Sequence, residues 1–288
     1  MTVLISRFFP EVFKMTILKS FHRTSYEILP HIIVENYKSE DQYQVFHFFN
    51  DKEIFYEFFK VTVEPGSTAL DCGLNFGMHT DMFIELGAKN VVAFEASKEV
   101  LGKIRSKYES NPNVTIIEKA LSNEAGIVKF YECNASGASS LRRTRDLREH
   151  GGYEYEVEAI PLDDVPLIQN VDHISCIKVD LEGADLLALS GGKDLIQKHK
   201  PYIIMEYVDT LVEYELDGQK LNKYSILQFC EKAEYIPFNL YGICVLDEDV
   251  FEESILEDMN DLILVQIVNW RNGQPGGSQN INMRCLKS

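Results

Sequence analysis

Residues 69–77 read Ala69-Leu70-Asp71-Cys72-Gly73-Leu74-Asn75-Phe76-Gly77, and this stretch decides the fold. An apolar run ends in a carboxylate, a Gly-x-Asn-x-Gly turn follows, and a helical pattern then starts. Glycine has no Cβ, so it adopts positive φ and lets a ligand approach the peptide groups. The stretch therefore predicts a strand, a ligand-binding turn and a helix, in that order.

A second apolar run, Val91-Val92-Ala93-Phe94, ends in Glu95, which lies 22 residues after Gly73. A carboxylate at this distance, at the end of the second strand of a doubly wound sheet, accepts the hydroxyls of a ribose. A dinucleotide would require Gly-x-Gly-x-x-Gly, and Asp71 before the turn would repel its pyrophosphate. The same carboxylate would attract the ammonium of S-adenosylmethionine, so we expect that cofactor, with an NAD-dependent oxidoreductase as the alternative.

Composition excludes some partners. The chain has 288 residues, 45% of them hydrophobic, which is ample for a core. Its 45 acidic and 28 basic residues give a net charge of −17, so a nucleic-acid partner is not expected. The six cysteines show no metal-binding spacing. We expect buried thiols in a reducing compartment, and hence a cytoplasmic protein.

The N-terminal segment is apolar and basic. No run of 18 uncharged apolar residues occurs, so we expect a soluble chain without a transmembrane segment. Residues 1–23 lack a signal-peptide cleavage pattern. They suit a flap packed on the core or on a second subunit of a homo-oligomer, or alternatively a helix at a membrane surface. We favour the flap.

Hydrophobic patterning divides the chain into an N-terminal helical extension (1–65), a core domain (66–270) and a loose C-terminal tail (271–288). The aromatic residues between Phe46 and Phe59 predict helices in the extension. In the core we expect strands near 67–72, 91–95, 114–119, 174–180, 202–207, 235–240, 243–247 and 262–268, and helices near 76–87, 98–109, 184–198 and 223–233. Such β-α-β alternation predicts a mostly parallel twisted sheet with helices on both faces. Residues 127–132 and 155–160 predict an antiparallel edge hairpin with no helix between its strands.

A second motif, Lys178-Val179-Asp180-Leu181-Glu182-Gly183, follows a later strand. If extended geometry persists, Lys178, Asp180 and Glu182 share one side. Glu206 ends the next strand, and ligands bind beyond the carboxyl ends of strands in open α/β sheets. Alternatively, Asp180 or Glu182 caps the following helix.

These motifs resemble the FkbM-type S-adenosylmethionine-dependent methyltransferases over about residues 66–207. The resemblance rests on 70–77, Phe94-Glu95, Ala120-Leu121-Ser122, Ser139-Ser140-Leu141, 177–185 and Met205-Glu206. It implies a Rossmann-like class I methyltransferase fold and methyl transfer to a hydroxyl of a sugar, glycan, glycolipid or secondary metabolite. Ala96 departs from the family pattern, which usually has Pro after the ribose carboxylate.

The motifs assign roles to individual residues. The expected cofactor-binding residues are Asp71, Gly73 and Asn75 around the methionine moiety, Glu95 on the ribose, Ser122 near the adenine, and Gly77 and Ala96 beside them. The expected catalytic residues are Asp180, Glu182, Glu206 and Lys178, under the acceptor. Either Lys178 holds the neighbouring carboxylates in place or one of these carboxylates acts as the base.

A metal ion and a histidine are the two further candidates for the chemistry. Three carboxylates suit a hydrated divalent ion, but Lys178 already balances their charge, so we expect no metal. His79 opens the first helix of the core, and a lone histidine there is more often a packing residue than a catalytic one.

Four of the nine arginines fall within seven residues, at Arg142, Arg143, Arg145 and Arg148. They suit an anionic acceptor, such as a nucleotide-linked sugar or acidic glycan, or alternatively form a solvated helix face paired with carboxylates. A non-catalytic scaffold with this fold is a third function, although intact Asp71, Glu95 and Asp180 count against it.

Overall fold

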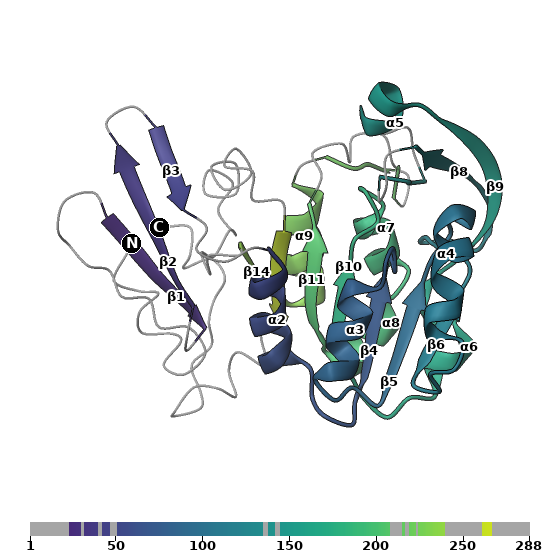
Figure 1. Cartoon of the computed structure of the whole chain (residues 1–288), viewed down its shortest axis with the longest axis horizontal. Helices are drawn as coiled ribbons and strands as arrows, with labels where there is room; N and C mark the ends of the chain where they lie inside the picture. The colour runs from purple at the N-terminus through teal and green to yellow at the C-terminus, as the bar shows by residue number, and fades with distance from the viewer. Residues whose placement is uncertain are drawn as a thin grey trace.

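The computed structural model describes ten stretches of the chain, shown in Figure 1. They are residues 23–29, 32–39, 42–46, 51–134, 138–141, 145–207, 215–216, 219–222, 224–239 and 261–266. The predictions for residues 1–22, for the strand at 243–247, for the tail at 271–288 and for Arg142 and Arg143 lie outside these stretches.

A seven-stranded sheet forms the centre of the core domain (Figure 1). In spatial order the strands are β14 (Tyr235–Asn239), β15 (Asp261–Gln266), β11 (Tyr202–Glu206), β10 (Ile174–Val179), β4 (Thr68–Cys72), β5 (Asn90–Phe94) and β6 (Val114–Ile117). β15 is antiparallel to both of its neighbours, and the remaining pairs are parallel. This is the mostly parallel sheet that the β-α-β pattern predicts.

Helices cover both faces of the sheet (Figure 1). One face carries α2 (Asp51–Thr62), α3 (Met78–Glu85) and α4 (Lys98–Tyr108), and the other carries α6 (Pro166–Gln169), α7 (Asp185–Ser190), α8 (Lys193–His199) and α9 (Ser225–Ala233), with a short 3-10 turn at Leu162–Asp164. Local signals define α4: the Ser97 hydroxyl accepts from Val100 N at 3.0 Å, and Arg105 and Lys107 occupy the last turn. The predicted Rossmann-like architecture is confirmed.

A ribbon of strands lies beyond the β6 edge of the main sheet (Figure 1). Its strands β8 (Gly126–Cys133) and β9 (Gly152–Ile160) pair as predicted, and the two-residue strand β7 (Ala120–Leu121) joins β9 in parallel. The prediction that no helix separates the strands is wrong, because α5 (Arg145–His150) lies between them. It carries Arg145 and an exposed Arg148.

Two further predictions need correction. The single helix expected near 184–198 is divided into α7 and α8 at Gly191 and Gly192. The carbonyl of Ser122 approaches Gly191 too closely for any side chain at that position. The extension is not wholly helical: β1 (Arg23–Leu29), β2 (Ile32–Ser39) and β3 (Gln42–Phe46) form an antiparallel sheet. Tyr26, Ile28 and Val34 are residue types that strands favour. The helix expected around Phe55 is present as α2. A small β12 (Glu215–Leu216) and β13 (Gln219–Lys220) hairpin completes the described elements.

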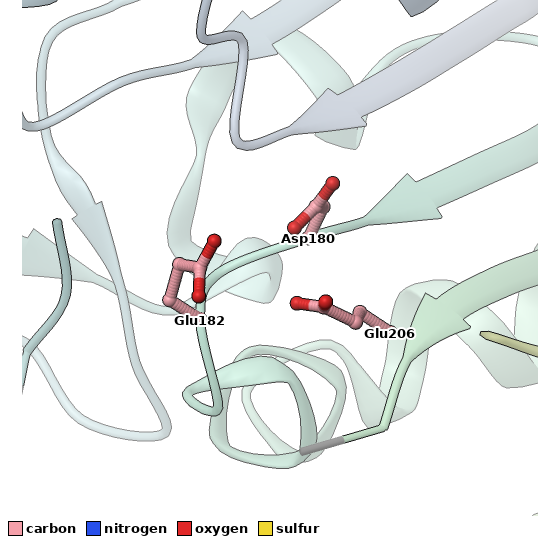
Figure 2. A group of neighbouring side chains, drawn as sticks. All are labelled: Asp180, Glu182 and Glu206. Atoms are coloured by element: carbon pink, nitrogen blue, oxygen red, sulfur yellow. The ribbon is translucent and has the colours of Figure 1, made fainter. Parts of the chain in front are cut away.

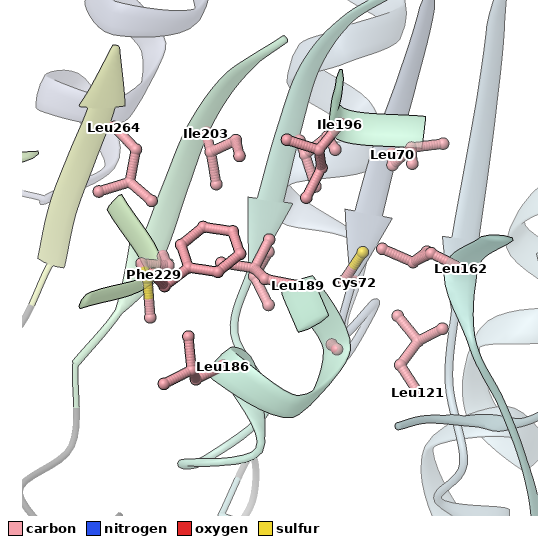
Figure 3. Packing of buried hydrophobic residues seen from close by; sticks show 14 of the residues in the cluster. Leu70, Cys72, Leu121, Leu162, Leu186, Leu189, Ile196, Ile203, Phe229 and Leu264 are labelled. Carbon is pink, nitrogen blue, oxygen red and sulfur yellow. The ribbon is translucent and has the colours of Figure 1, made fainter. Parts of the chain in front are cut away.

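The apolar core lies between the sheet and α7 to α9 (Figure 3). Side chains alternate along β4, so Leu70 and Cys72 face this core whereas Asp71 faces α3. Figure 3 shows Leu186, Leu189 and Phe229 packed against the strands. Four of the six cysteines are described, Cys72, Cys133, Cys176 and Cys230, and all four are buried free thiols, as expected.

The glycine turn is wedged between the ends of two neighbouring strands. Gly73 has φ +103°, and its N–H and that of Leu74 donate to the carbonyl of Phe94 at 3.1 and 2.9 Å. On the other side, Asp180 N donates to the carbonyl of Cys72 at 2.8 Å. A Cβ on Gly73 would collide with the carbonyl oxygen of Asp180. Only glycine therefore fits where β4, β5 and β10 end.

We expect Gly73→Ala to lower the free energy of unfolding by at least about 2 kcal/mol, because the new methyl group meets backbone and the positive φ is strained. Urea denaturation measures the change. Gly102→Ala is the matched control, since Gly102 lies inside α4 with open space around it. Alanine there should be neutral or stabilise by up to about 1 kcal/mol. Similar effects at both positions would contradict the wedged turn.

Candidate functional site

A cavity of about 100 Å³ opens at the carboxyl ends of β4, β5 and β10. Its lining residues come from the glycine turn, the end of β5, the ribbon and the turn after β10. They are Gly73, Asn75, Phe94, Glu95, Ala96, Ser97, Val100, Lys119, Ala120, Leu121, Phe130, Ser139, Ser140, Leu141, Asp180, Leu181, Glu182 and Ala184. The cavity thus joins both sequence motifs, at the edge of the sheet where ligands of α/β proteins bind.

Glu95 organises one end of the cavity. Its Oε2 accepts from Asn75 N at 2.9 Å, and its Oε1 accepts from Ala96 N at 2.9 Å and Ser97 N at 2.8 Å. Burial raises the pKa of Glu95, and these three backbone N–H groups offset part of the rise. A carboxylate has about four acceptor positions, so capacity for a ligand hydroxyl is left.

Asn75 offers an unsatisfied acceptor at the same end. It has φ +45°, and within the described residues its Oδ1 is buried without a hydrogen-bond partner. A buried acceptor that lacks a partner costs free energy. A ligand donor at the cavity wall would remove that cost, so this atom fits a bound hydroxyl or ammonium group.

Asp71 does not line the cavity. It is fully buried on the face of β4 covered by α3, where Thr80 Oγ1 donates to its Oδ2 at 2.6 Å and its Oδ1 has no partner within the described part of the chain. Strand alternation explains this position: Cys72 is the last residue of β4, and Asp71, one residue earlier, points to the opposite face of the sheet. The wall expected from Asp71 is formed instead by Gly73 and Asn75.

Two other expected cofactor residues lie outside the cavity wall. Gly77 precedes α3 with φ +76° and packs against Tyr108, whose hydroxyl lies 2.9 Å from the Gly77 carbonyl. The Ser122 hydroxyl contacts Asn123, and its carbonyl packs against Gly191. Residues 119–121, just before Ser122, line the cavity in place of Ser122. Ala96 lines the cavity, as expected.

Three carboxylates converge at the other end of the site (Figure 2). One carboxylate oxygen from each of Asp180, Glu182 and Glu206 lies within 4.8 Å of the other two, a spacing that could hold a metal ion. Asp180 and Glu182 line the cavity, and Glu206 lies behind them on β11. The extended chain expected here ends at Val179, because Glu182 has φ +51° and Gly183 has φ +92°. A turn, and not strand alternation, therefore brings Asp180 and Glu182 together.

Lys178 is the buried counter-charge of this cluster. It is 1% exposed, does not line the cavity, and places its Nζ 3.5 Å from Asp180 Oδ2 and 3.3 Å from Asp261 Oδ1, with the Phe55 ring 5.3 Å away. Burial lowers the pKa of Lys178, but the surrounding carboxylates, Asp180 first, outweigh it and leave the pKa above its ordinary value. Lys178 is therefore charged.

Asp180 and Glu206 differ in protonation. Burial raises the pKa of Asp180, but the charge of Lys178 and a hydrogen bond from Glu206 outweigh it and lower the pKa below its usual range. Burial and the nearby carboxylates, led by Asp180, raise the pKa of Glu206 to about 10. At neutral pH Asp180 is thus ionised and Glu206 is protonated, which limits the negative charge of the cluster.

Neither Asp180 nor Glu182 has the expected capping role, because the N-cap of α7 is Ala184 and makes no side-chain capping hydrogen bond. Asp185, the first residue of α7, instead holds the turn that precedes the helix. It is 1% exposed and accepts from Leu181 N at 3.3 Å and Gly183 N at 3.0 Å. Burial, then the charge of Asp180, raises the pKa of Asp185 to about 7. Sequence reasoning missed this role, although an Asp in the first turn of a helix is a recognised signal.

His79 packs where α2 meets α3. Its ring contacts Phe55 and Phe59 at centroid distances of 5.2 and 5.8 Å, both edge-on. Burial lowers the pKa of His79 to about 3, so the ring is neutral. These contacts suit the packing role favoured from the sequence.

The strand order, the glycine turn and the cavity at the sheet edge define the class I methyltransferase fold. The family model described as "Methyltransferase FkbM domain" matches residues 71–235, more than half of the chain. The chain belongs to the FkbM methyltransferase family.

Individual proteins are also similar to this chain. The 2-O-methyltransferase NoeI of Sinorhizobium fredii is 26% identical over 159 residues, covering 51% of this chain and 65% of NoeI. The chain therefore spans less than two thirds of that relative. Methyltransferase FkbM from Methylobacillus flagellatus is 14% identical with a TM-score of 0.42, covering 73% of this chain and 50% of that chain. Fibrillarin from Aeropyrum pernix is 11% identical with a TM-score of 0.37, covering 88% of this chain and 98% of fibrillarin.

We expect Asp71→Asn to change the pH dependence of stability. Burial raises the pKa of Asp71 from 3.8 to about 7, so the folded protein retains a proton that the unfolded chain releases. The resulting stability is full below about pH 4 and is lost as the pH rises through about 7. Between these limits wild type should lose up to about 1.4 kcal/mol per pH unit relative to the variant, because an asparagine side chain stays neutral.

Urea denaturation of both proteins at pH 5 and pH 7 measures this loss. The amide that replaces the carboxyl group keeps an acceptor oxygen for the hydroxyl of Thr80, so the hydrogen bond at that position is retained in the variant. If the free energy of unfolding changed equally between pH 5 and pH 7 in wild type and in Asp71→Asn, the raised pKa of Asp71 would be contradicted.

Proposed function

We propose that this protein is an S-adenosylmethionine-dependent O-methyltransferase that acts on a hydroxyl of a sugar, glycan, glycolipid or secondary metabolite. One observation carries the proposal: a single cavity has the glycine turn and Glu95 at one end and Asp180 and Glu182 at the other. Membership of the FkbM family supports it. The name of the relative NoeI, a 2-O-methyltransferase, supports oxygen as the methyl acceptor.

The residues at the first end fit the proposed cofactor. Glu95 has acceptor capacity for ribose hydroxyls, and Asn75 has a buried oxygen that requires a donor. S-adenosylmethionine supplies a methyl group activated on a sulfonium. Gly73 presents only backbone atoms to the cavity, and Leu121 and Phe130 give an apolar surface for an aromatic base. Asp71 supports the turn from the α3 face of β4, through the hydrogen bond that it accepts from Thr80.

The residues at the other end suit a hydroxyl acceptor. Methyl transfer is an in-line displacement, so alignment of the acceptor oxygen accounts for much of the rate. Asp180 is ionised beside Lys178 and accepts a hydrogen bond from the acceptor hydroxyl, which directs the oxygen into the cavity. Asp180 or Glu182 then takes the hydroxyl proton. Glu206 keeps its own proton and supports Asp180 from behind.

Binding of the cofactor product tests the first half of the proposal. We expect S-adenosylhomocysteine, and not NAD, to bind in calorimetric titration, and Glu95→Gln to weaken that binding about tenfold or more, because an amide N–H₂ would face backbone N–H groups. Glu99→Gln is the matched control, since Glu99 is an exposed residue of α4. NAD binding at the same site would instead favour the oxidoreductase.

Methyl incorporation into a panel of hydroxylated acceptors tests the second half. We expect transfer to at least one acceptor, with Asp180→Asn lowering kcat more than it raises the cofactor Kd. Cofactor binding without transfer to any acceptor would favour the non-catalytic scaffold.

Chelation distinguishes a carboxylate site from a metal site. We expect dialysis against EDTA to leave methyl transfer unchanged, because Lys178 and the proton on Glu206 already limit the charge that Asp180 and Glu182 present. Activity before and after dialysis, with and without added Mg²⁺, is the measurement. Loss on chelation that Mg²⁺ restores would assign Asp180, Glu182 and Glu206 as metal ligands.

We further propose that the arginines near α5 favour acceptors with an anionic group remote from the reacting hydroxyl. The acidic cavity end would repel an anion placed next to Asp180, whereas Arg148 is exposed on α5. Arg142→Ala and Arg143→Ala should lower kcat/KM about tenfold for charged acceptors and little for matched neutral ones. Equal losses on both acceptor types would remove the anion-site proposal.

A further inference from the structure

A buried carboxylate outside the cavity connects its two ends. Glu132 lies on β8 and is 3% exposed. Its Oε1 accepts from Ser97 Oγ at 2.6 Å and Ser139 Oγ at 3.0 Å, and its Oε2 accepts from the Tyr155 hydroxyl at 2.6 Å. Three hydroxyl groups from three different segments thus share one acceptor.

The donor direction of these three bonds is fixed. Ser97 Oγ accepts from Val100 N at 3.0 Å, and Ser139 Oγ accepts from Cys133 N at 3.0 Å. The Tyr155 oxygen likewise accepts from Lys98 N at 3.0 Å. Each hydroxyl has one proton, which is directed to the carboxylate. An amide in place of this carboxylate cannot accept all three protons in the same arrangement, because its nitrogen is a donor.

Both serines line the cavity, and they come from segments that are far apart in the sequence. Ser97 N donates to Glu95 at 2.8 Å, so Ser97 belongs to the proposed ribose end. Ser139 is followed by Ser140, which pairs with Tyr131 in an isolated bridge and donates from its Oγ to the carbonyl of Glu182 at 2.9 Å. A path therefore runs from the Glu95 turn through Glu132 to the strained turn at Glu182, by hydrogen bonds and by the peptide bond between Ser139 and Ser140.

We propose that Glu132 is a positioning residue that couples cofactor binding at Glu95 to the arrangement of the acceptor-side segment 139–141. The proposal rests on the function proposed above. Glu132 touches neither ligand; it acts through Ser97 and Ser139. Cofactor bound against Glu95 fixes Ser97, Ser97 fixes Glu132, and Glu132 fixes Ser139 and the wall that receives the acceptor.

Calorimetry and hydrogen exchange with S-adenosylhomocysteine test the coupling in the full chain. In wild type, we expect the ligand to slow exchange at the amides of residues 139–141. In Glu132→Gln, we expect Kd to rise about tenfold and, at saturating ligand, the slowing at 139–141 to be lost while that at residues 73–75 is kept. Glu156→Gln, an exposed carboxylate on β9 of the same ribbon, should behave as wild type.

A second variant tests the same coupling if Glu132→Gln does not fold. Tyr155→Phe keeps the ring that packs on Phe130 and removes one donor to Glu132. We expect it to raise Kd about threefold and to reduce the slowing at 139–141 in part. The double variant with Glu132→Gln should be no worse than Glu132→Gln alone, because the two residues act through one interaction.

The outcomes separate two failures. If wild type does not bind S-adenosylhomocysteine, the proposed function is overturned and the coupling with it. If wild type binds but folded variants show unchanged slowing at 139–141, the coupling alone is overturned. Should Glu132→Gln fail to fold, an unchanged Tyr155→Phe would overturn the coupling equally.

Discussion

The site depends on the close contact of three strand ends at Gly73. The turn donates two backbone hydrogen bonds to Phe94, at the end of β5, and lies against the carbonyl of Asp180, after β10. Because no side chain fits between them, the residues that follow β5 and β10 are fixed relative to the turn. Glu95 and Asp180 therefore face the same cavity although 85 residues separate them in the sequence.

The sequence predicts what depends on local patterning. Alternation of apolar runs with helical patterns identifies the parallel strands β4, β5, β6, β10 and β11. The positions of Glu95 and Asp180 follow because each comes directly after a strand. It does not predict the strands of residues 23–46, where aromatic residues suit either element. Nor does it predict the break at Gly191, where the chain packs against the carbonyl of the distant Ser122.

Within the site, prediction fails where tertiary contacts decide the role of a residue. Asp71 and Ser122 lie beside the cavity but are directed away from it, because strand alternation and the turn between α7 and α8 fix their orientation. Asp185 accepts hydrogen bonds from the turn after β10, because the positive φ of Glu182 and Gly183 reverses the chain toward it. Sequence spacing locates these carboxylates to within a residue or two, but it does not determine which one faces the ligand.

The electrostatics of the site follow from how its buried carboxylates are satisfied. Backbone N–H groups serve Glu95 and Asp185, Thr80 serves Asp71, and Asp180 pairs with the cation Lys178. Dipoles stabilise a charge without cancelling it, so the cavity keeps a negative potential. Such a potential suits a cationic sulfonium and a neutral hydroxyl at the reacting centre. Asp71 and Asp185 are buried beside this site, and their raised pKa values are a cost in stability as the pH rises through about 7.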